Sequence, residues 1–367
     1  MFLAVRELKH AKFRYLLIGF IMILVAWLTF IVSGLANGLA ADNASAMKNM
    51  KGDYVVLQDN AEQKLARSSI PTDQLDEIRQ QEGVKEAAPL SQTMVTLSQT
   101  GKDKKIDVTI FGIEPKSMIM PDIAEGRTIE NLGENEVVVD ASLKENGVAI
   151  GDMLENEDTG VSVTVVGFAE SQMFSHMPVL YTDTGSWNHM MESTGRQQKP
   201  SYSAIIVKGN KDVQTSLEKK ISHIEVVTKD QAIKSIPGYK EEQGSLTMMI
   251  SFLIVIAAFV QAVFFYVITL QKTNQFGVLK AIGAKTSYLA KNLIGQVLIL
   301  AITAIGMSIA LTFGVSALFP EGMPFELGTD TLVKYSALLI GVAVIGALLS
   351  LQRIAKIDAI EAIGRVE

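Results

Sequence analysis

Long uncharged stretches alternate with charged ones along the chain. Asp, Glu, Lys and Arg are absent from residues 15–41, 243–271, 292–320 and 335–352. A helix of about 20 apolar residues crosses the hydrocarbon core of a bilayer, and about 17 is the lower limit. Helices in soluble cores seldom run this far without a charge. The pattern therefore predicts four transmembrane helices at these positions.

Residues 42–242, between the first and second predicted spans, have the composition of a soluble domain. β-Branched runs separated by Gly, Asn and Asp turns predict strands at residues 53–57, 108–111, 136–139, 161–166, 204–207 and 224–227. Helices are expected from Pro71 and at residues 216–221. Because the two kinds of element do not alternate regularly, we expect an α+β domain with a mixed or antiparallel sheet. A helical stalk at residues 47–50 is expected to join it to the first span.

Charge is distributed unevenly between the predicted segments. Residues 42–242 carry 21 Lys and Arg against 32 Asp and Glu, a net charge of −11, whereas the whole chain has −6. Basic residues cluster at residues 1–14 and 272–291, and cytoplasmic segments of membrane proteins are enriched in them. We therefore expect these segments and the tail at residues 353–367 in the cytoplasm. The acidic domain and the loop at residues 321–334 are expected outside the cell membrane, and the acidic surface argues against a nucleic-acid partner.

Other sequence features limit the chemistry of the chain. The first apolar stretch exceeds the roughly 7–15 residues of the apolar h-region of a secretory signal peptide, so we interpret it as a retained anchor. The chain has no cysteine, which excludes disulfides, Cys-based catalysis and Cys-ligated zinc. Its four histidines are far apart in the sequence, at His10, His176, His189 and His223. Surface or structural roles suit them better than zinc or a catalytic triad, and nothing indicates an enzyme.

A segment that resembles a phosphate-binding loop lacks the required spacing. The loop has four residues between two glycines and a lysine directly after the second. Here five residues separate Gly277 from Gly283, and Ala284 stands before Lys285. The segment also follows a predicted membrane helix rather than a strand. We therefore reject nucleotide binding by this chain.

The same segment is typical of a short amphipathic helix in the cytoplasm. Its apolar positions are spaced to share one face, with lysines beside them: Phe276, Leu279, Lys280, Ile282 and Lys285. Gly283 supplies a turn before the third span. Such a helix fits a groove on a soluble partner, and an inert connector on the membrane surface fits the residues equally well. Residues 1–14, which mix apolar and basic positions, predict a second interfacial helix.

Small and polar residues within the spans predict helix contacts. Gly34 and Gly38 form a small-xxx-small step, which permits a second helix to approach the first span closely. Gln261 lies near the middle of the second span. A buried Gln in a membrane usually makes an interhelical hydrogen bond worth about 1 kcal/mol, and we interpret Gln261 as such a packing residue.

A methionine pair at the outer end of the second span has two interpretations. The thioethers of Met248 and Met249 can ligate haem iron, and Phe252 one turn away can stack on a porphyrin. Methionine more often fills apolar gaps, and the chain contains 16 of them. The residues alone favour the gap-filling role.

The order of segments and several sequence runs resemble the MacB/FtsX-like permeases of ABC transporters. The runs that carry this resemblance are QFGVLKAIGA at residues 275–284, EVVVD at 136–140, GD at 151–152, VTVVG at 163–167 and IDAIEAI at 357–363. Ala359 stands where the family commonly has proline. The resemblance implies a permease without its own ATPase site, working as a homodimer with two copies of a separate ATPase that binds ATP. The implied ATPase-coupling residues are Phe276, Gly277, Leu279, Lys280, Ile282, Gly283 and Lys285.

Within that family the chain is most similar to the haem-exporter permeases of Gram-positive bacteria. The similar runs are Met248 and Met249, FFYV at residues 264–267, TLQK at 269–272 and FIVSGLANGL at 30–39. This resemblance implies haem export and detoxification by ATP-driven mechanotransmission, through a cleft near the outer ends of the first two spans. Candidate haem ligands are Met248 and Met249, with Phe252 as a stacking wall, Tyr239 as a phenol, and Lys48 and Lys51 as partners of the propionates.

Two other functions fit the same architecture. In the first, the permease exports a peptide, an antibiotic or a lipoprotein instead of haem. Alternatively, the chain moves no cargo and passes the motion of the ATPase to an outer partner such as a wall hydrolase. The sequence itself does not distinguish these possibilities, because apolar spans resemble one another by composition.

Overall fold

The computed structural model divides the chain into two compact units, each described by itself. The helical unit comprises Met1–Gly38 and Gly244–Glu367, and the sheet unit comprises Leu39–Gln243. The structure describes residues 12–99, 104–130, 135–156, 159–193, 200–320 and 323–355. The predicted interfacial helix, apart from its last three residues, and the C-terminal run at residues 357–363 lie outside the described residues.

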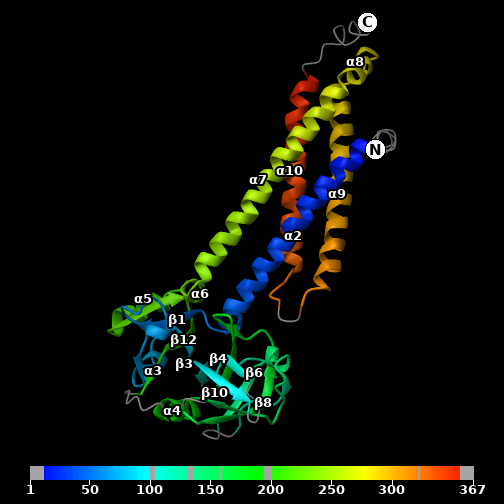
Figure 1. Cartoon of the computed structure of the whole chain (residues 1–367). Helices are drawn as coiled ribbons and strands as arrows, with labels where there is room; N and C mark the ends of the chain where they lie inside the picture. The colour runs from blue at the N-terminus through cyan, green and yellow to red at the C-terminus, as the bar shows by residue number, and fades with distance from the viewer. Residues whose placement is uncertain are drawn as a thin grey trace. The chain divides into compact units, whose positions relative to one another are not determined.

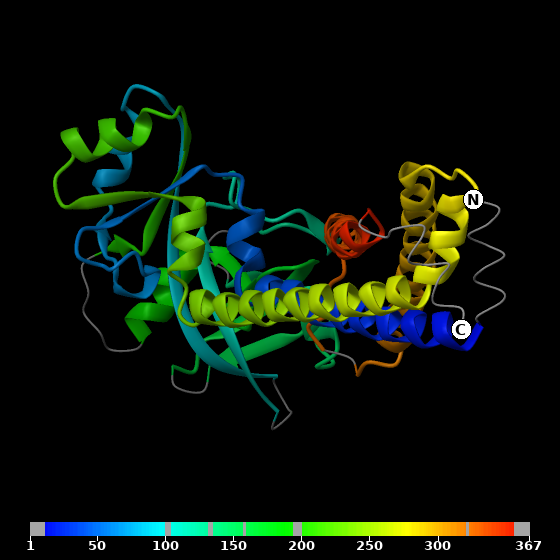
Figure 2. The same ribbon diagram turned by 90° about the horizontal axis from the view of Figure 1, so that it is seen from above.

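Four helices in the described part of the chain are long and apolar enough to cross a membrane (Figure 1). They are α2 (Lys12–Asn49), α7 (Tyr239–Gln271), α9 (Thr286–Ser316) and α10 (Thr329–Ala355). Each coincides with one of the charge-free stretches, although the third stretch runs to residue 320, past the end of α9. Helices suit the hydrocarbon core because they satisfy their backbone hydrogen bonds internally. The helix α2 continues without a break into the segment expected as a stalk and ends at Asn49, and α7 is likewise continuous (Figure 2).

Apolar stripes hold the helical unit together. Its largest cluster draws on all four helices and contains Tyr15, Ile18, Met22, Phe265, Ile268, Val297, Ala301, Ala304, Ala343 and Ala347. Small side chains let the helices approach closely. A Cβ atom at Gly346 of α10 would lie 3.2 Å from the backbone nitrogen of Ala262 in α7. Gln261 is buried beside this contact, as expected for a packing residue, but its Oε1 has no hydrogen-bond partner in the described structure.

Gly34 and Gly38 of α2 pack against a loop. The prediction that a second helix approaches them is therefore wrong. A Cβ atom at Gly38 would lie 2.2 Å from the carbonyl oxygen of Pro324, and one at Gly34 would lie 2.2 Å from the Phe325 ring. The N–H of Glu326 donates to the carbonyl of Gly34 at 3.0 Å. The glycines do permit close approach, but the connection between α9 and α10 occupies the space they leave.

The sheet unit is an α+β domain built on a mixed sheet, as the sequence predicts. Along its main path the described strands follow the order β13-β1-β12-β3-β4-β10-β6-β8-β5, with β7 and β9 off this path. Its pairs β4–β10 and β6–β8 are parallel, whereas β1–β12, β3–β4 and others are antiparallel. The strands are β1 (Tyr54–Gln58), β3 (Val84–Gln99), β4 (Lys105–Ile113), β5 (Ile123–Gly126), β6 (Glu136–Asp140), β7 (Met153–Asn156), β8 (Ser162–Ala169), β9 (Met173–Phe174), β10 (Met177–Asp183), β12 (Ala204–Gly209) and β13 (Ile224–Thr228). A separate pair joins β2 (Ile70–Pro71) and β11 (Ser201–Tyr202).

Short helices flank this sheet, and the end of α2 enters its core. They are η1 (Leu65–Arg67), α3 (Gln74–Arg79), η2 (Ala141–Lys144), α4 (Thr184–Ser193), α5 (Val213–Lys220) and α6 (Lys229–Lys234). Ala44 and Met47 of α2 are fully buried in one cluster with Phe111 and Tyr181 of the sheet. The stalk is therefore part of the domain core, which explains why the sheet unit begins inside α2.

Candidate functional site

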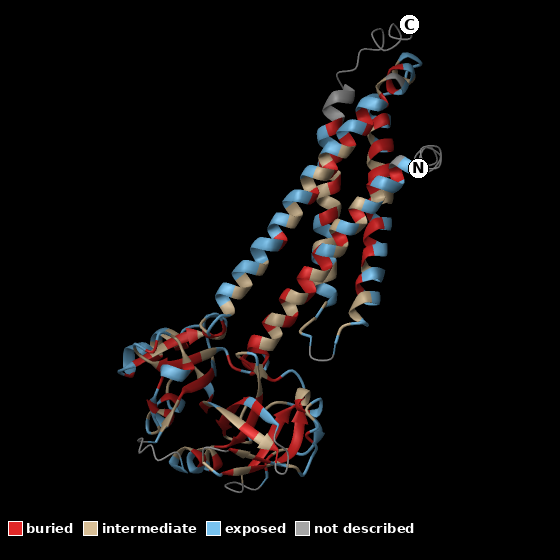
Figure 3. Ribbon diagram, viewed as in Figure 1, coloured by how far each residue is buried: buried red, intermediate tan, exposed pale blue. Residues whose placement is uncertain are grey.

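One face of α7 carries large apolar side chains that the described parts of the chain leave exposed (Figure 3). Met248 is 57% exposed, Met249 45% and Phe252 60%, and the exposed face continues through Phe259 and Val263. The opposite face is buried at Ile250, Ala257, Gln261, Phe265, Ile268 and Thr269. Exposed side chains three and four residues apart form one stripe on a helix. This stripe is available to lipid, cargo or another protein in the membrane.

The structure brings the methionine pair and Phe252 onto this stripe, but not between the first two spans. Val32 and Ala36 of α2 and Ile250 of α7 are buried together in one cluster. Their contact occupies the space between α2 and α7 within one chain. The candidate ligands lie on the other side of α7, so a cleft around them requires a surface from outside this chain.

The remaining haem candidates belong to the sheet unit. The Nζ atom of Lys48 lies 5.6 Å from the centroid of the Tyr239 ring and donates to the carbonyl of Ala40 at 3.1 Å. Lys51 instead forms an exposed ion pair with Asp122 at 3.3 Å. The structure therefore joins Lys48 to Tyr239 and engages Lys51 elsewhere.

A polar cluster that the sequence did not predict joins α2, the β9–β10 turn and α7 within the sheet unit. Nδ1 of His176 lies 2.8 Å from Oδ2 of Asp42, and Nε2 lies 3.1 Å from Nδ2 of Asn43. Asn43 also donates to Glu242 at 3.3 Å. Ser175 and His176 have φ of +53° and +61°, a region that costs a non-glycine residue roughly 1–2 kcal/mol. The cluster thus holds the ends of both connecting helices, and no motif signals it because its members are distant in sequence.

A buried lysine links three helices at the end of α7. The Nζ atom of Lys272 donates to Oε1 of Gln296 in α9 at 3.2 Å, and the hydroxyl of Tyr15 in α2 donates to the same oxygen at 3.0 Å. Lys272 also lies over the Tyr15 ring, 5.6 Å from its centroid. Since α8 (Thr273–Ala281) begins directly after Lys272, these contacts tie the start of α8 to α2 and α9.

The predicted coupling segment does form a helix, but its apolar residues do not share one face. Phe276 is buried against Leu289 and Leu293 of α9, whereas Ile282 and Val278 are exposed. Gly283 has φ of +96° and ends the segment in the expected turn. The surface offered to a partner is therefore the Val278–Ile282 side, and Phe276 fixes the helix to its own chain.

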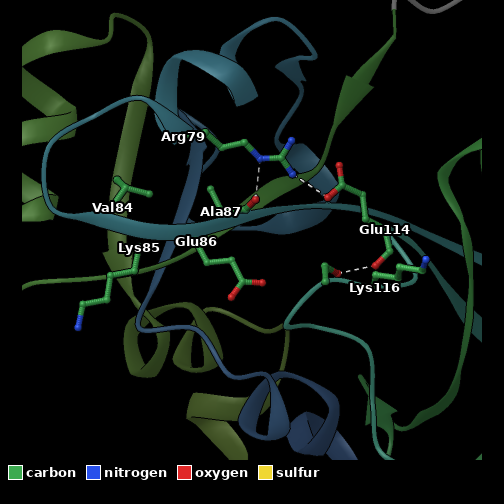
Figure 4. Close-up of a pocket in the computed structure, with 8 residues that line it drawn as sticks. Arg79, Val84, Lys85, Glu86, Ala87, Glu114 and Lys116 are labelled. Atoms are coloured by element: carbon green, nitrogen blue, oxygen red, sulfur yellow. Dashed lines mark hydrogen bonds and ion pairs between the residues drawn. The ribbon is translucent and has the colours of Figure 1, made fainter.

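A shallow pocket of about 350 Å³ in the sheet unit has no predicted role (Figure 4). Arg79 crosses it, donating to the carbonyl of Ala87 at 3.0 Å and to Glu114 at 2.6 Å. Lys85 and Glu86 line it with opposite charges. Because Arg79 is engaged on both sides, the pocket suits a structural role.

Family models match both units of the chain. A MacB-like periplasmic core domain matches residues 16–224, and an FtsX-like permease C-terminal domain matches residues 247–359. An α+β domain of the MacB type between the first and second of four apolar helices defines a permease of an ABC transporter, embedded in the cell membrane. The chain belongs to the MacB/FtsX-like permease family.

Full-length relatives narrow the position of the chain within this family. It is 32% identical over 367 residues to a Staphylococcus haemolyticus protein provisionally named hemin transport system permease protein HrtB, with 100% of both chains covered. A Staphylococcus epidermidis protein of the same provisional name is also 32% identical, with 99% of both chains covered. An uncharacterized ABC transporter permease of Mycobacterium tuberculosis is 23% identical, again with 99% of both covered.

A solved structure resembles part of the chain more distantly. The periplasmic region of MacB from Actinobacillus actinomycetemcomitans aligns at 14% identity and a TM-score of 0.39. The alignment covers 52% of this chain and 94% of that region. The family assignment rests on the family models and the full-length relatives.

Proposed function

We propose that this permease exports haem from the cell membrane as the membrane subunit of an ABC transporter. The observation that carries the proposal is the 32% identity, over the whole chain, to staphylococcal proteins provisionally named hemin transport permeases. The exposed stripe of α7 supplies suitable chemistry. Thioethers of Met248 and Met249 suit haem iron, and the Phe252 ring suits stacking on the flat macrocycle.

The working assembly is a homodimer with two copies of a cytoplasmic ATPase. Two copies of the chain face each other through the exposed stripes of α7, which places Met248, Met249 and Phe252 along a shared cleft. Haem is flat and largely apolar, so it enters this cleft from the bilayer. Such an arrangement supplies the second surface that one chain lacks, because Val32 and Ile250 already fill the space between α2 and α7.

The ATPase acts on the cleft through mechanotransmission. Its closure on ATP pushes the exposed Val278–Ile282 side of α8 in the cytoplasm, where both chain termini also lie. The push passes through Lys272 and Gln296 to α2, α7 and α9, whose tilting narrows the cleft and moves the extracytoplasmic sheet unit. Haem is expelled outward as the cleft closes.

The proposal is tested by hemin tolerance of haem-sensitive cells that express the permease with its cognate ATPase. The control is the same pair with ATP hydrolysis disabled in the ATPase, after complex formation has been confirmed for both. We expect tolerance and lower cell-associated haem only when hydrolysis is active. Equal sensitivity of the two strains would contradict haem export and favour another cargo or mechanotransmission without cargo.

A further inference from the structure

Two hollows of the sheet unit meet between η1 and β3. One has a volume of about 800 Å³ and the other about 630 Å³. Ala66, Arg67, Gln92 and Met94 line both, so the two are neighbouring parts of one cleft. Pockets for small molecules typically have about 300–1,000 Å³, so either part is large enough for a ligand.

The smaller hollow has an apolar floor. Its buried apolar lining residues are Leu65, Phe174 and Ile236, and Gln92 is a buried polar residue beside them. Phe174 is fixed by an edge-on contact with the Phe111 ring, at a centroid distance of 5.4 Å. The side chain of Met94 is 43% exposed and lines this hollow as well. A flat apolar ligand can therefore lie on a rigid surface beside an accessible thioether.

Cations surround this floor although the domain is acidic. The charged residues that line the hollow are Lys64, Arg67, Lys234, Lys240 and a single acid, Glu241. Residues 42–242 have a net charge of −11, so a lining with four cations and one acid departs strongly from the average of the domain. Charges of one sign gathered in a pocket attract a ligand of the other sign.

Two of the four cations are held in place by a neighbouring carboxylate. Lys64 lies 3.0 Å and Arg67 2.7 Å from Glu62. The hydrogen bond from Lys64 and the charge of Arg67 lower the pKa of Glu62. Lys234 and Lys240 are exposed and form no ion pair with the described residues. They are therefore available to carboxylates of a ligand.

The hollow also adjoins the helix that carries the haem candidates. Lys240 and Glu241, at the beginning of α7, line it together with Gly238, which directly precedes the helix. Met248 follows Glu241 by seven residues in the same helix.

We infer that this hollow is a second haem site, which receives haem after it leaves the membrane. The macrocycle lies on the floor of Leu65, Phe174 and Ile236, the propionates pair with Lys234 and Lys240, and Met94 offers its sulfur to the iron. The inference rests on the proposed function, because haem reaches this site only if haem is the cargo. It adds to the methionine pair of α7 a site that lies wholly within the sheet unit.

A hemin titration of the full chain in nanodiscs tests the role of the lysines. Lys234→Glu with Lys240→Glu is compared with Lys219→Glu with Lys220→Glu, which changes the charge equally on exposed residues of α5 outside the hollow. We expect the first pair to weaken one hemin-binding step roughly tenfold and the second pair to leave it unchanged. The dimethyl ester of haem, which has no free carboxylates, should bind both variants and the parent chain alike.

The visible spectrum of bound hemin tests the role of Met94. Met94→Leu is compared with Met153→Leu, because Met153 of β7 has a similar exposure, 47%, and lies outside the hollow. We expect the spectrum of the hemin bound in the lysine-dependent step to change in Met94→Leu and to stay the same in Met153→Leu. Should the charge reversal disturb folding, Lys234→Gln with Lys240→Gln removes the charges without repulsion and should weaken the same step by a smaller factor.

Failure of the inference is distinguishable from failure of the proposed function. If hemin binds in a single step that substitutions of Lys234, Lys240 and Met94 do not affect, the second site does not exist. This outcome would not contradict haem export. If both lysine pairs weaken binding equally, the effect is one of overall charge and the site is likewise excluded. If the parent chain binds no hemin and its ATPase confers no tolerance, the proposed function itself fails.

Discussion

The helices α2 and α7 both pass from the spans into the sheet unit, yet they are packed differently. In the most apolar window of each helix, 39% of the residues are buried in α2 and 28% in α7. The carbonyl of Ile23 in α2 accepts from Ser308 at 2.8 Å, and Asn37 donates to Thr331 at 2.7 Å. The two helices also differ in where their large side chains are exposed. Those of α2 are confined to residues 13–28, whereas those of α7 run from residue 248 to residue 270.

This difference indicates that α2 is fixed by contacts within the chain, whereas α7 has a face that is available to a partner. Association of helices within a bilayer depends on close packing and hydrogen bonds, because lipid is as apolar as the side chains. The helix α2 has both, at Gly34, Gly38 and Asn37. The exposed stripe of α7 has neither within one chain, so its partner is lipid, cargo or a second copy.

The largest expected effect concerns assembly through the exposed stripe. The chain contains no cysteine, so an introduced one is its sole thiol. Phe259→Cys on the exposed stripe should give mostly disulfide-linked dimer on mild oxidation in membranes, whereas Ile345→Cys, exposed on α10, should remain monomeric. Gel mobility with and without reductant measures this. Equal cross-linking at the two positions would contradict a dimer formed through α7.

The next largest effect compares the two faces of α7 in stability. Phe265→Ala removes a buried ring from the cluster that joins the four helices and should destabilise the chain by about 3 kcal/mol or more. Phe259→Ala on the exposed face should change stability by less than about 0.5 kcal/mol. Thermal unfolding in detergent measures both. Similar losses for the two rings would mean that α7 has no distinct faces.

An intermediate effect is expected where the α9–α10 connection meets α2. A methyl group at Gly38 meets the backbone of Pro324, so Gly38→Ala should cost about 1–3 kcal/mol. At Gly19 the nearest atom is the Leu300 side chain, 4.0 Å away, so Gly19→Ala should be neutral or stabilise slightly. The same unfolding measurement applies. A stabilised Gly38→Ala variant would show that α2 is not anchored there.

The smallest effect concerns the hydrogen bond between Asn37 and Thr331. Such bonds between membrane helices are worth about 0.6 kcal/mol on average, so Asn37→Ala should lower the melting temperature only slightly. Thr331→Ala should cost about as much, and the double variant no more than either single variant. Additive losses would mean that the two side chains act independently.

The sequence predicted six of the 11 described strands of the main sheet and missed β5, β7, β9, β10 and its longest described strand, β3. The run VKEAAPLSQTMVTLSQ contains few of the β-branched residues by which the other strands were recognised. Its partners impose the extended form, because β3 pairs with β12, β4 and β7. Proline lacks a backbone N–H and cannot donate to a neighbouring strand. Pro89 is tolerated because it is paired on one side only, with Ile205 of β12, and the pairing with β4 starts at Leu90.

The candidate site was predictable only where it is local in the sequence. Met248 and Phe252 are one turn apart in a single helix, so spacing alone placed them on one face. The cluster around His176 and the cleft at Met94 combine residues that only the sheet topology brings together. The Gly34–Gly38 step lies between these cases: small residues indicate an accessible backbone, but not what occupies the space beside it.

The account is tested most directly by haem export through variants of the α7 stripe. Met248→Ala with Met249→Ala is compared with Met307→Ala, a 51% exposed methionine of α9, at matched membrane levels and with an active ATPase. The measured quantity is cell-associated haem after hemin exposure. We predict that the double variant retains as much haem as cells with the inactive ATPase, while Met307→Ala exports like the parent chain. Undiminished export by the double variant would contradict the assignment of this face of α7 to the cargo.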